Sequence, residues 1–307
     1  MENPEKPENH VIETFPAKRL ISPFKDGGME FFSADYNMNL YRGCNHGCIY
    51  CDTRSECYQI DRFDIVRCKE NCIAMLETEL RQKKKTGLVN VGAASDPYNA
   101  YEETACITRR SLELFRRYGF GIALTTKGTL ITRDADVLAE IKREAPVRVA
   151  FSITAADDSL AALIESGAPV TSARFDALRT IAEAGIFAGI WLNPMLPFLT
   201  DNEDNVRALL QKTAECGGRF AVCHFGMTLR TGNREYFYAA LDREPRFRGI
   251  KQQYIEAFGL SYMCASPHAE ALHSLFCAEC ERLGLMYRFA DINRATTEGC
   301  PQQLTMF

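Results

Sequence analysis

Three cysteines stand close together in the first quarter of the chain, and their spacing suits a metal cluster. Cys44, Cys48 and Cys51 follow a C-x3-C-x2-C pattern. Iron–sulfur clusters are held by cysteine thiolates, and closely spaced cysteines let one short loop wrap around one cluster. Three thiolates on a four-iron cube leave one iron open to an exogenous chelating ligand. Gly43 and Gly47 allow the tight backbone turns that such a loop needs.

Zinc is the alternative occupant of these thiols. Structural zinc takes four ligands, commonly in paired spacing. The loop offers only three cysteines, and His46 would be a poorly placed fourth ligand. The spacing therefore favours an iron–sulfur cluster.

Four cysteines near the C-terminus form a candidate second metal site. Cys277 and Cys280 share a face of a predicted helix, and Cys264 and Cys300 would complete the set. Zinc or an auxiliary cluster would accept this set. Packing as small apolar residues is the alternative, because cysteine is readily buried.

Composition indicates a globular protein in a reducing compartment. The chain has 307 residues, of which 46% are hydrophobic, and 13 cysteines. We find no apolar run of membrane-spanning length and no apolar signal segment, so we expect a cytoplasmic protein without a membrane partner. Thiols in such a compartment ligate metals rather than pair as disulfides.

The formal net charge of −4 does not favour binding of nucleic acid by the protein as a whole. Two local groups of arginines could still contact DNA or RNA, with solvated surfaces as the alternative. These groups are Arg109, Arg110, Arg116 and Arg117 on a predicted helix, and Arg243, Arg246 and Arg248 downstream.

Short β-rich runs alternate with amphipathic helical runs from residue 87 onward, which indicates a parallel sheet with helical crossovers. With a strand before the cysteine loop there would be six βα units. The predicted fold is α/β, a partial (β/α)6 barrel, with an ordinary doubly wound sheet as the alternative. The expected strands are Leu88–Ala93, Gly121–Thr126, Val147–Thr154, Ile186–Asn193 and Arg219–Met227, and the expected helices lie near 68–85, 106–118, 133–143, 171–184, 202–216, 247–258 and 267–283.

This pattern divides the chain into three parts. Residues 1–35 contain several prolines and read as an N-terminal arm, 36–232 hold the partial barrel, and 233–307 form a helical C-terminal cap and tail. In barrels of this kind, chemistry gathers at the C-terminal ends of the strands. Polar and reactive residues at those ends are Ser95, Tyr98, Lys127, Ser152, Asn193 and Cys223.

The motifs together resemble the spore photoproduct lyase-like branch of the radical S-adenosylmethionine (SAM) enzymes. The cysteine loop, Ser95-Asp-Pro-Tyr98 and Leu124-Thr-Thr-Lys127 occur in the family's order, and the likeness covers roughly residues 36–230. The resemblance implies a partial barrel, a [4Fe–4S] cluster on the three loop cysteines, and SAM bound to the open iron. One electron then cleaves SAM to a 5′-deoxyadenosyl radical.

The resemblance also implies residues that contact SAM. Ser95 and Lys127 would do so, with Lys127 paired to the SAM carboxylate through a charge-assisted hydrogen bond. A solvated lysine at a strand end is the alternative. Tyr50 in the cysteine loop, with Ser152 and Asn193 at strand ends, are further candidate cofactor contacts.

Two positions depart from the family's pattern. Spore photoproduct lyases use a cysteine as hydrogen-atom donor where this chain has Ala93, and a tyrosine after the third cluster cysteine where this chain has Asp52. We therefore expect a different reaction or a different donor. Tyr98, Cys223 and Cys264 are candidate members of a radical relay.

These observations leave three functions open. The first is a radical SAM enzyme acting on a nucleic-acid lesion or base, the second the same chemistry on a small molecule or protein, and the third a non-catalytic metal-binding adaptor. Either enzyme needs a reductant such as a flavodoxin or ferredoxin.

The last residues, Gln303-Leu-Thr-Met-Phe307, resemble the peptide by which DNA-processing proteins dock on the bacterial sliding clamp. Packing of this tail on its own domain is the alternative.

Overall fold

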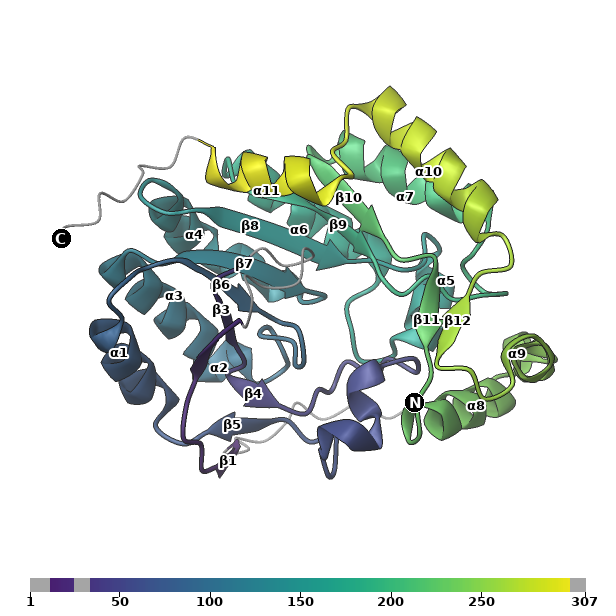
Figure 1. Ribbon diagram of the computed structural model, residues 1–307, viewed down its shortest axis with the longest axis horizontal. Coiled ribbons are helices and arrows are strands. Elements are labelled where there is room, and N and C mark those ends of the chain that lie inside the picture. Colours follow the sequence, from purple (N-terminus) through teal and green to yellow (C-terminus); the bar gives the residue numbers. More distant parts are fainter. Residues whose placement is uncertain (1–11, 25–33, 299–307) are drawn as a thin grey trace, which may run out of the picture.

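A seven-stranded sheet forms the centre of the protein (Figure 1), seen in a computed structural model that describes residues 12–24 and 34–298. Every neighbouring pair of strands runs parallel except the last, which is antiparallel. Parallel strands need crossover connections, which here are helical. In spatial order the strands are β10 (Phe220–Cys223), β9 (Phe187–Leu192), β8 (Val147–Ser152), β7 (Gly121–Thr126), β6 (Leu88–Val91), β3 (Tyr36–Met38) and β2 (Ile21–Pro23).

The sheet confirms the predicted partial (β/α)6 barrel. Six of its strands, β3 and β6 to β10, are parallel, and β3 is the strand expected before the cysteine loop. Among the described residues, β10 and β2 form the two edges, so the sheet stays open. The edge strand β2 comes from the N-terminal arm, which the sequence predicts only as an extended segment.

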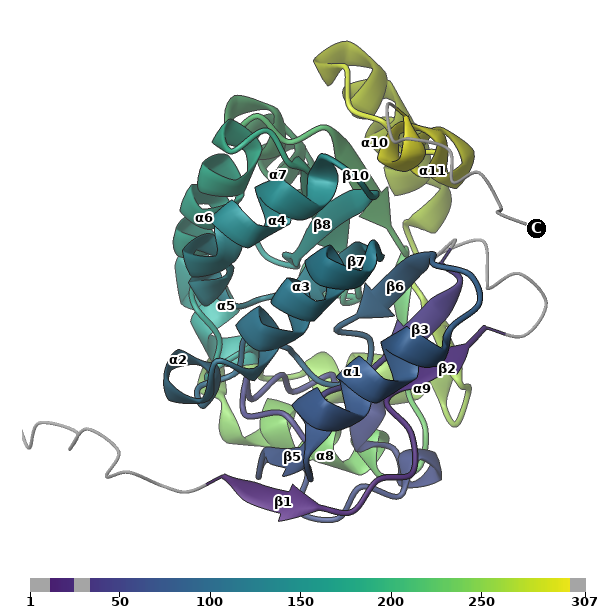
Figure 2. The ribbon, with the colours of Figure 1, turned by 90° about the vertical axis from the view of Figure 1, so that its left-hand side faces the viewer.

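Helices cover the outer face of the sheet. The connecting helices are α1 (Cys72–Gln82), α2 (Glu102–Ala105), α3 (Ile107–Tyr118), α4 (Ala135–Lys142), α5 (Asp158–Ile164), α6 (Thr171–Glu183) and α7 (Glu203–Glu215). α3 packs against both α1 and α4, and Figure 2 shows these three helices in front of the strands. Because side chains alternate along a strand, Val147, Val149 and Phe151 of β8 all pack into this helical layer.

The C-terminal part of the described chain adds a β-hairpin and further helices. The sequence predicts two of these helices, α9 and α10, and misses α8 and α11. No helix in the described ranges is both long and apolar enough to cross a membrane. The elements are β11 (Gly226–Thr228), α8 (Asn233–Arg243), a 3-10 turn η5 (Pro245–Phe247), α9 (Ile250–Phe258), β12 (Met263–Ala265), α10 (Ala269–Leu283) and α11 (Phe289–Thr297).

Helix α11 covers the inner face of the open sheet. It lies along β8 in Figure 1, while α10 packs on α7. Phe289 and Ile292 of α11 pack against Ala150, Phe220 and Val222, which point away from the outer helical layer. The interior that an incomplete barrel would leave open is therefore filled in part by the chain's own C-terminal region.

The helix expected at 68–85 begins later than predicted. It starts at Cys72, because Asn71 takes a left-handed conformation with φ of 50° that a helix cannot continue through. Cys68 lies instead in a strand of a second, three-stranded sheet beside the cysteine loop. That sheet consists of β1 (Glu13–Phe15), β5 (Arg67–Lys69) and β4 (Tyr41–Arg42).

The strand expected at Arg219–Met227 is two strands. β10 ends at Cys223, and the chain then pairs antiparallel with β12 as β11. Apolar residues continue through both strands, so the pattern alone does not mark the change of partner. Three 3-10 turns also escape the pattern: η2 (Asp52–Arg54), η3 (Glu56–Tyr58) and η4 (Thr129–Asp134).

The arginines of α3 are engaged on the outer surface. Arg109 forms an ion pair with Asp136 at 2.8 Å, and Arg116 forms one with Glu140. Exposed pairs of this kind contribute little to stability. They fit a solvated helix face better than nucleic-acid contact, the other explanation weighed for these arginines.

Replacing Phe151 by alanine tests the packing of the outer layer. Phe151 in β8 is fully buried, and loss of a buried phenylalanine side chain costs about 3–5 kcal/mol. We expect the free energy of unfolding, measured by denaturant titration, to fall by that amount. Leu260→Ala is the control, because Leu260 is 90% exposed and should change it by less than about 0.5 kcal/mol. Equal effects would contradict this assignment of the core.

Candidate active site

The cysteine loop follows β4 and is held by backbone hydrogen bonds on two sides. The Cys44 amide donates to the Phe63 carbonyl at 2.8 Å, and the Ile49 amide donates to the Ile164 carbonyl at 2.9 Å. Gly43 has φ of 80°, and a Cβ there would lie 2.6 Å from the Phe63 carbonyl oxygen. Only glycine fits this position, so the chain itself shapes the loop.

A segment that follows α5 closes on the loop. Cys48 and Glu165 form an antiparallel β-bridge, and the Gly167 amide donates to the His46 carbonyl at 2.9 Å. A Cβ on Gly167 would lie 2.1 Å from the Asn45 carbonyl oxygen. The close backbone approach therefore requires glycine here as well.

The three loop cysteines carry free thiols, and Cys51 lines a cavity. Burial raises the pKa of all three thiols, that of Cys44 to about 12. Cluster binding would displace these protons, because iron binds the thiolate. Among the described residues, no three His, Cys, Asp or Glu side chains converge as a single metal ion requires. A four-iron cluster differs from a single metal ion, because each thiolate binds a different iron. The three thiols therefore need not converge on one point.

The cavity beside Cys51 has a volume of about 460 Å3 and lies at the C-terminal ends of the parallel strands. Ligand sites in barrels of this kind gather at this edge. Tyr50, Lys127, Ser152 and Asn193 all line it. Four of the five predicted cofactor contacts therefore face one space next to the cysteine loop.

Lys127 stands at the centre of the polar contacts in this cavity. Its Nζ donates to Ser152 Oγ at 2.7 Å and lies 3.6 Å from Glu165 Oε1. It also lies 5.7 Å from the centre of the Tyr50 ring, and the Tyr50 hydroxyl donates to Glu165. Two predicted residues, Lys127 and Tyr50, thus meet at a carboxylate that the sequence does not single out.

Arg174 of α6 is the second cation of this network. It is fully buried, forms an ion pair with Glu165 at 2.5 Å and donates to the Ser152 carbonyl at 2.9 Å. Burial would raise the pKa of Glu165, but Lys127 and Arg174 hold it below its ordinary value. Two cations therefore face Glu165, and the ammonium group of Lys127 also lines the cavity, where it can bind an anionic group of a ligand.

Asp96 ties two strand ends to the cysteine loop. One carboxylate oxygen accepts from the Thr126 hydroxyl at 2.6 Å, and the other accepts from the Lys127 amide at 2.7 Å. His46 Nδ1 lies 3.4 Å from the second oxygen. Burial lowers the pKa of His46. Asp96 lies inside a predicted motif, but only the structure reveals this bridging role.

Three predicted site residues do not line the cavity. Ser95 Oγ donates to the Gly43 carbonyl at 2.5 Å, so it holds the loop, and its contact with SAM stays a prediction. The Tyr98 hydroxyl donates to Asp134 at 3.1 Å, and Cys223 packs against the outer core. These placements do not favour the predicted radical relay through Tyr98 and Cys223, which also stays a prediction.

Both departures from the family's pattern face the cavity. Ala93 lines it, and so does Asp52. Asp52 accepts hydrogen bonds from the Tyr58 hydroxyl at 3.0 Å and the Thr228 hydroxyl at 2.9 Å, and Arg230 Nε lies 3.4 Å away. A carboxylate fixed by three groups therefore occupies the wall where spore photoproduct lyases carry a tyrosine.

Sequence reasoning misses four residues of the site. Trp191 and His224 line the cavity, and their positions near the ends of predicted strands were an available signal. Glu165 and Arg174 lie in a helical connection, where a charged residue is usually exposed. No local pattern marks these two as buried.

The candidate second metal set is not assembled among the described residues. Cys264 and Cys280 are buried in separate hydrophobic clusters. Cys277 Sγ lies 3.7 Å from His273 Nε2. Cys300 lies outside the described residues. Packing as small apolar side chains therefore accounts for Cys264 and Cys280.

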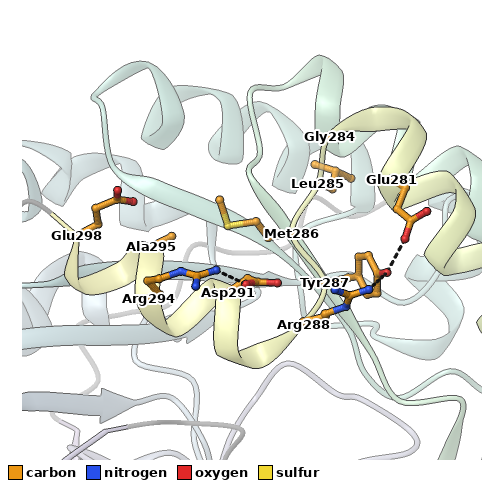
Figure 3. Close-up of a pocket in the computed structure, with 10 residues that line it drawn as sticks. All are labelled: Glu281, Gly284, Leu285, Met286, Tyr287, Arg288, Asp291, Arg294, Ala295 and Glu298. Carbon is orange, nitrogen blue, oxygen red and sulfur yellow. Dashed lines mark hydrogen bonds and ion pairs between the residues drawn. The ribbon is translucent and has the colours of Figure 1, made fainter.

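A further cavity of about 450 Å3 lies between α10 and α11 (Figure 3). Its charged side chains pair with their neighbours: Arg294 pairs with Asp291, and the Tyr287 hydroxyl donates to Glu281 at 2.8 Å. This cavity is not at the strand ends and holds none of the predicted site residues. The sliding-clamp peptide predicted at Gln303–Phe307 is outside the described residues.

Residues 38–213 match the Radical SAM superfamily, and the chain belongs to this superfamily. The uncharacterized protein Rv2578c of Mycobacterium tuberculosis is 34% identical over 215 residues, which cover 68% of this chain and 63% of that protein. The uncharacterized protein MJ0683 of Methanocaldococcus jannaschii is 30% identical over 190 residues, covering 61% and 68%. The match thus spans less than two thirds of the mycobacterial relative's length.

Solved structures share the fold and confirm the predicted resemblance to spore photoproduct lyase. Spore photoproduct lyase complexed with dinucleoside spore photoproduct superposes with a TM-score of 0.65 at 15% identity, covering 94% of this chain and 87% of that chain. The radical SAM methyltransferase TsrM of Kitasatospora setae, with tryptophan and a SAM analog bound, gives a TM-score of 0.51 at 12% identity, covering 80% and 51%.

Glu165→Gln tests the buried ion network. Removing one partner of a buried ion pair leaves uncompensated charge and costs about 3–5 kcal/mol. Because the pKa of Glu165 is lowered from its ordinary value of 4.5, the stability it contributes is full above pH 4.5 and is lost as pH falls through the folded-state pKa. Denaturant unfolding at several pH values measures both effects.

The matched control is Glu140→Gln. Glu140 pairs with Arg116 on the surface, where both side chains are about half exposed, and surface pairs are worth less than about 1 kcal/mol. A Glu165→Gln variant as stable as this control at neutral pH would contradict the assigned network.

Proposed function

We propose that this chain is a spore photoproduct lyase-like radical SAM enzyme that binds one [4Fe–4S] cluster through Cys44, Cys48 and Cys51. Bound and reduced, the cluster and SAM supply a 5′-deoxyadenosyl radical. The single observation that carries the proposal is the placement of Lys127. Its ammonium group lies at a strand end in the cavity that Cys51 lines, 2.7 Å from Ser152.

The cavity residues have defined tasks in this proposal. Lys127 pairs with the SAM carboxylate, and Glu165 holds the Lys127 ammonium group in position through their ion pair. Ser152 and Asn193 supply hydrogen bonds at neighbouring strand ends, and the centre of the Tyr50 ring lies 5.7 Å from the Lys127 ammonium group. Walls built from strand ends and the cysteine loop keep bulk water from a reactive ligand.

The proposed substrate is a base or lesion of a nucleic acid. Trp191 offers an aromatic face for stacking, and Asn193 and His224 offer hydrogen-bonding groups in the same cavity. One structural neighbour was solved with dinucleoside spore photoproduct. A small molecule or a protein is the alternative substrate, and an electron donor such as a flavodoxin or ferredoxin is the proposed partner.

The proposed reaction differs from spore photoproduct reversal. Ala93 has no S–H bond from which a radical could take a hydrogen atom. Asp52 is held by Tyr58, Thr228 and Arg230. An ionised carboxylate accepts hydrogen bonds. Asp52 is therefore suited to bind an N–H or O–H group of a substrate in the cavity.

Lys127→Met tests the SAM contact. Hydrogen bonds to charged groups are worth about 1.5–3 kcal/mol, so we expect the Kd for SAM to rise roughly 10- to 100-fold. Equilibrium dialysis of the anaerobically reconstituted protein measures it. Lys212→Met is the control, because Lys212 lies on the surface of α7 with a side chain 46% exposed, and its Kd should not change.

Release of 5′-deoxyadenosine under dithionite tests the radical chemistry in the same preparation. We expect release from the native chain and none from a variant with alanine at Cys44, Cys48 and Cys51. A reconstituted native chain that binds SAM but releases no 5′-deoxyadenosine would support the adaptor function instead.

Incubation with dinucleotide spore photoproduct tests the consequence of Ala93 in place of the hydrogen-donating cysteine. We expect 5′-deoxyadenosine formation without efficient recovery of two thymines, because Ala93 lacks the thiol. Chromatography of the products measures both. Recovery of thymines at the rate of 5′-deoxyadenosine formation would contradict the argument from Ala93. Deuterium transfer from labelled nucleosides, small molecules or peptides into 5′-deoxyadenosine separates the substrate classes.

A further inference from the structure

Two cysteines outside the cluster loop lie in direct contact. Cys68 Sγ and Cys72 Sγ are 3.6 Å apart, and both residues are at least 95% buried. Cys68 belongs to β5 and Cys72 is the first residue of α1. The left-handed residue Asn71 reverses the chain between them. The contact therefore arises from a strand-to-helix turn and not from one helix face.

The surroundings make this pair chemically different from the other buried cysteines. The thiol hydrogen bond from Cys68 lowers the pKa of Cys72, and the same contact raises the pKa of Cys68. Cys72 also lies at the N-terminus of α1, where the helix favours a thiolate. Glu70 and Asn71, which connect the two cysteines, are exposed, so the pair lies one short loop away from solvent.

We propose that Cys68 and Cys72 form a reversible disulfide when the chain meets a peroxide. The Cys72 thiolate attacks one peroxide oxygen, the O–O bond breaks, and Cys72 becomes a sulfenic acid as hydroxide leaves and takes up a proton. The Cys68 thiol then attacks the Cys72 sulfur, the S–O bond breaks, and a second water leaves. In total, two thiols and one hydrogen peroxide give one disulfide and two waters.

The geometry allows this step with a small local movement. The sulfurs must close from 3.6 Å to a bond length of about 2.05 Å. The five-residue segment Cys68–Cys72 contains the exposed turn, which can absorb the change. Because the connection is short, the disulfide constrains the unfolded chain little, and a thiol reductant should reverse it readily.

The pair also lies at the base of the cysteine loop. Cys68 is paired with Tyr41 across β4 and β5, and the Lys69 amide donates to the Leu40 carbonyl at 3.3 Å. β4 leads directly into Gly43 and Cys44. Oxidation of Cys68 and Cys72 would therefore change the position of β5, which pairs with the strand β4 that precedes the cysteine loop.

Peptide mapping of the full-length chain tests the proposal. The protein is treated with a stoichiometric amount of hydrogen peroxide at neutral pH, alkylated and digested with trypsin, which cleaves after Arg67, Lys69 and Arg81. We expect the peptide 68–69 linked to 70–81 through a disulfide, with loss of two hydrogen atoms. Dithiothreitol should restore two alkylatable thiols.

Two buried cysteines that contact no other thiol among the described residues serve as internal controls. Burial raises the pKa of both Cys216 and Cys264, so they should lose their free thiols at least roughly tenfold more slowly than Cys72. In Cys68→Ser, dimedone should trap a sulfenic acid on Cys72, and in Cys72→Ser, Cys68 should stay reduced. The proposal is overturned if Cys68 and Cys72 remain alkylatable after peroxide, or if Cys72 pairs with a cysteine of the cluster loop instead.

Discussion

One buried carboxylate connects the parts of this protein that must work together. Glu165 is bridged through its backbone to Cys48, receives a hydrogen bond from Tyr50, and pairs with Lys127 and Arg174. A charge in the interior is tolerated only when it is paired and hydrogen-bonded. The cysteine loop, the end of β7 and helix α6 are therefore placed by the same requirement, and none of them can move far without leaving a buried charge unpaired.

The sheet that carries this network changes character along its inner face. On β8, Ala150 packs against the apolar side chains of α11, whereas Ser152, two residues further on, lines the cavity beside Lys127. Because residues two apart point to the same side of a strand, one strand supplies both an apolar contact and a polar one. An open barrel can therefore be filled at one end by its own C-terminal helix and remain available to ligands at the other.

Residues of the family's pattern and the two departures from it line one cavity. Cys51, Lys127 and Ser152, which the resemblance to radical SAM enzymes predicts, lie on its walls. Ala93 and Asp52 stand where the resemblance implies the thiol and the phenol of a spore photoproduct lyase. They line the same cavity, and Asp52 directly follows Cys51. A carboxylate and a methyl group in place of a phenol and a thiol change the hydrogen bonds that the cavity offers to a ligand.

Local patterns in the sequence suffice for the cysteine loop, for the parallel strands and for Lys127 at a strand end. Spacing between near neighbours and the alternation of apolar residues carry this information directly. Such patterns place the start of α1 too early, because a run of helix-compatible residues does not reveal that Asn71 turns left-handed. They also merge β10 and β11, because both strands are apolar and only their partners differ.

The role of Glu165 depends on the folded chain. Tyr50 and Glu165 are 115 residues apart, and Arg174 comes from a helix whose charged positions normally face solvent. Nothing in the neighbourhood of either charged residue predicts burial, because the free energy of a buried charge is set by partners that only the packing of distant segments brings within reach. Cys68 and Cys72 are four residues apart, a spacing typical of one helix face. In the folded chain they meet across a strand-to-helix turn instead, which local spacing does not predict.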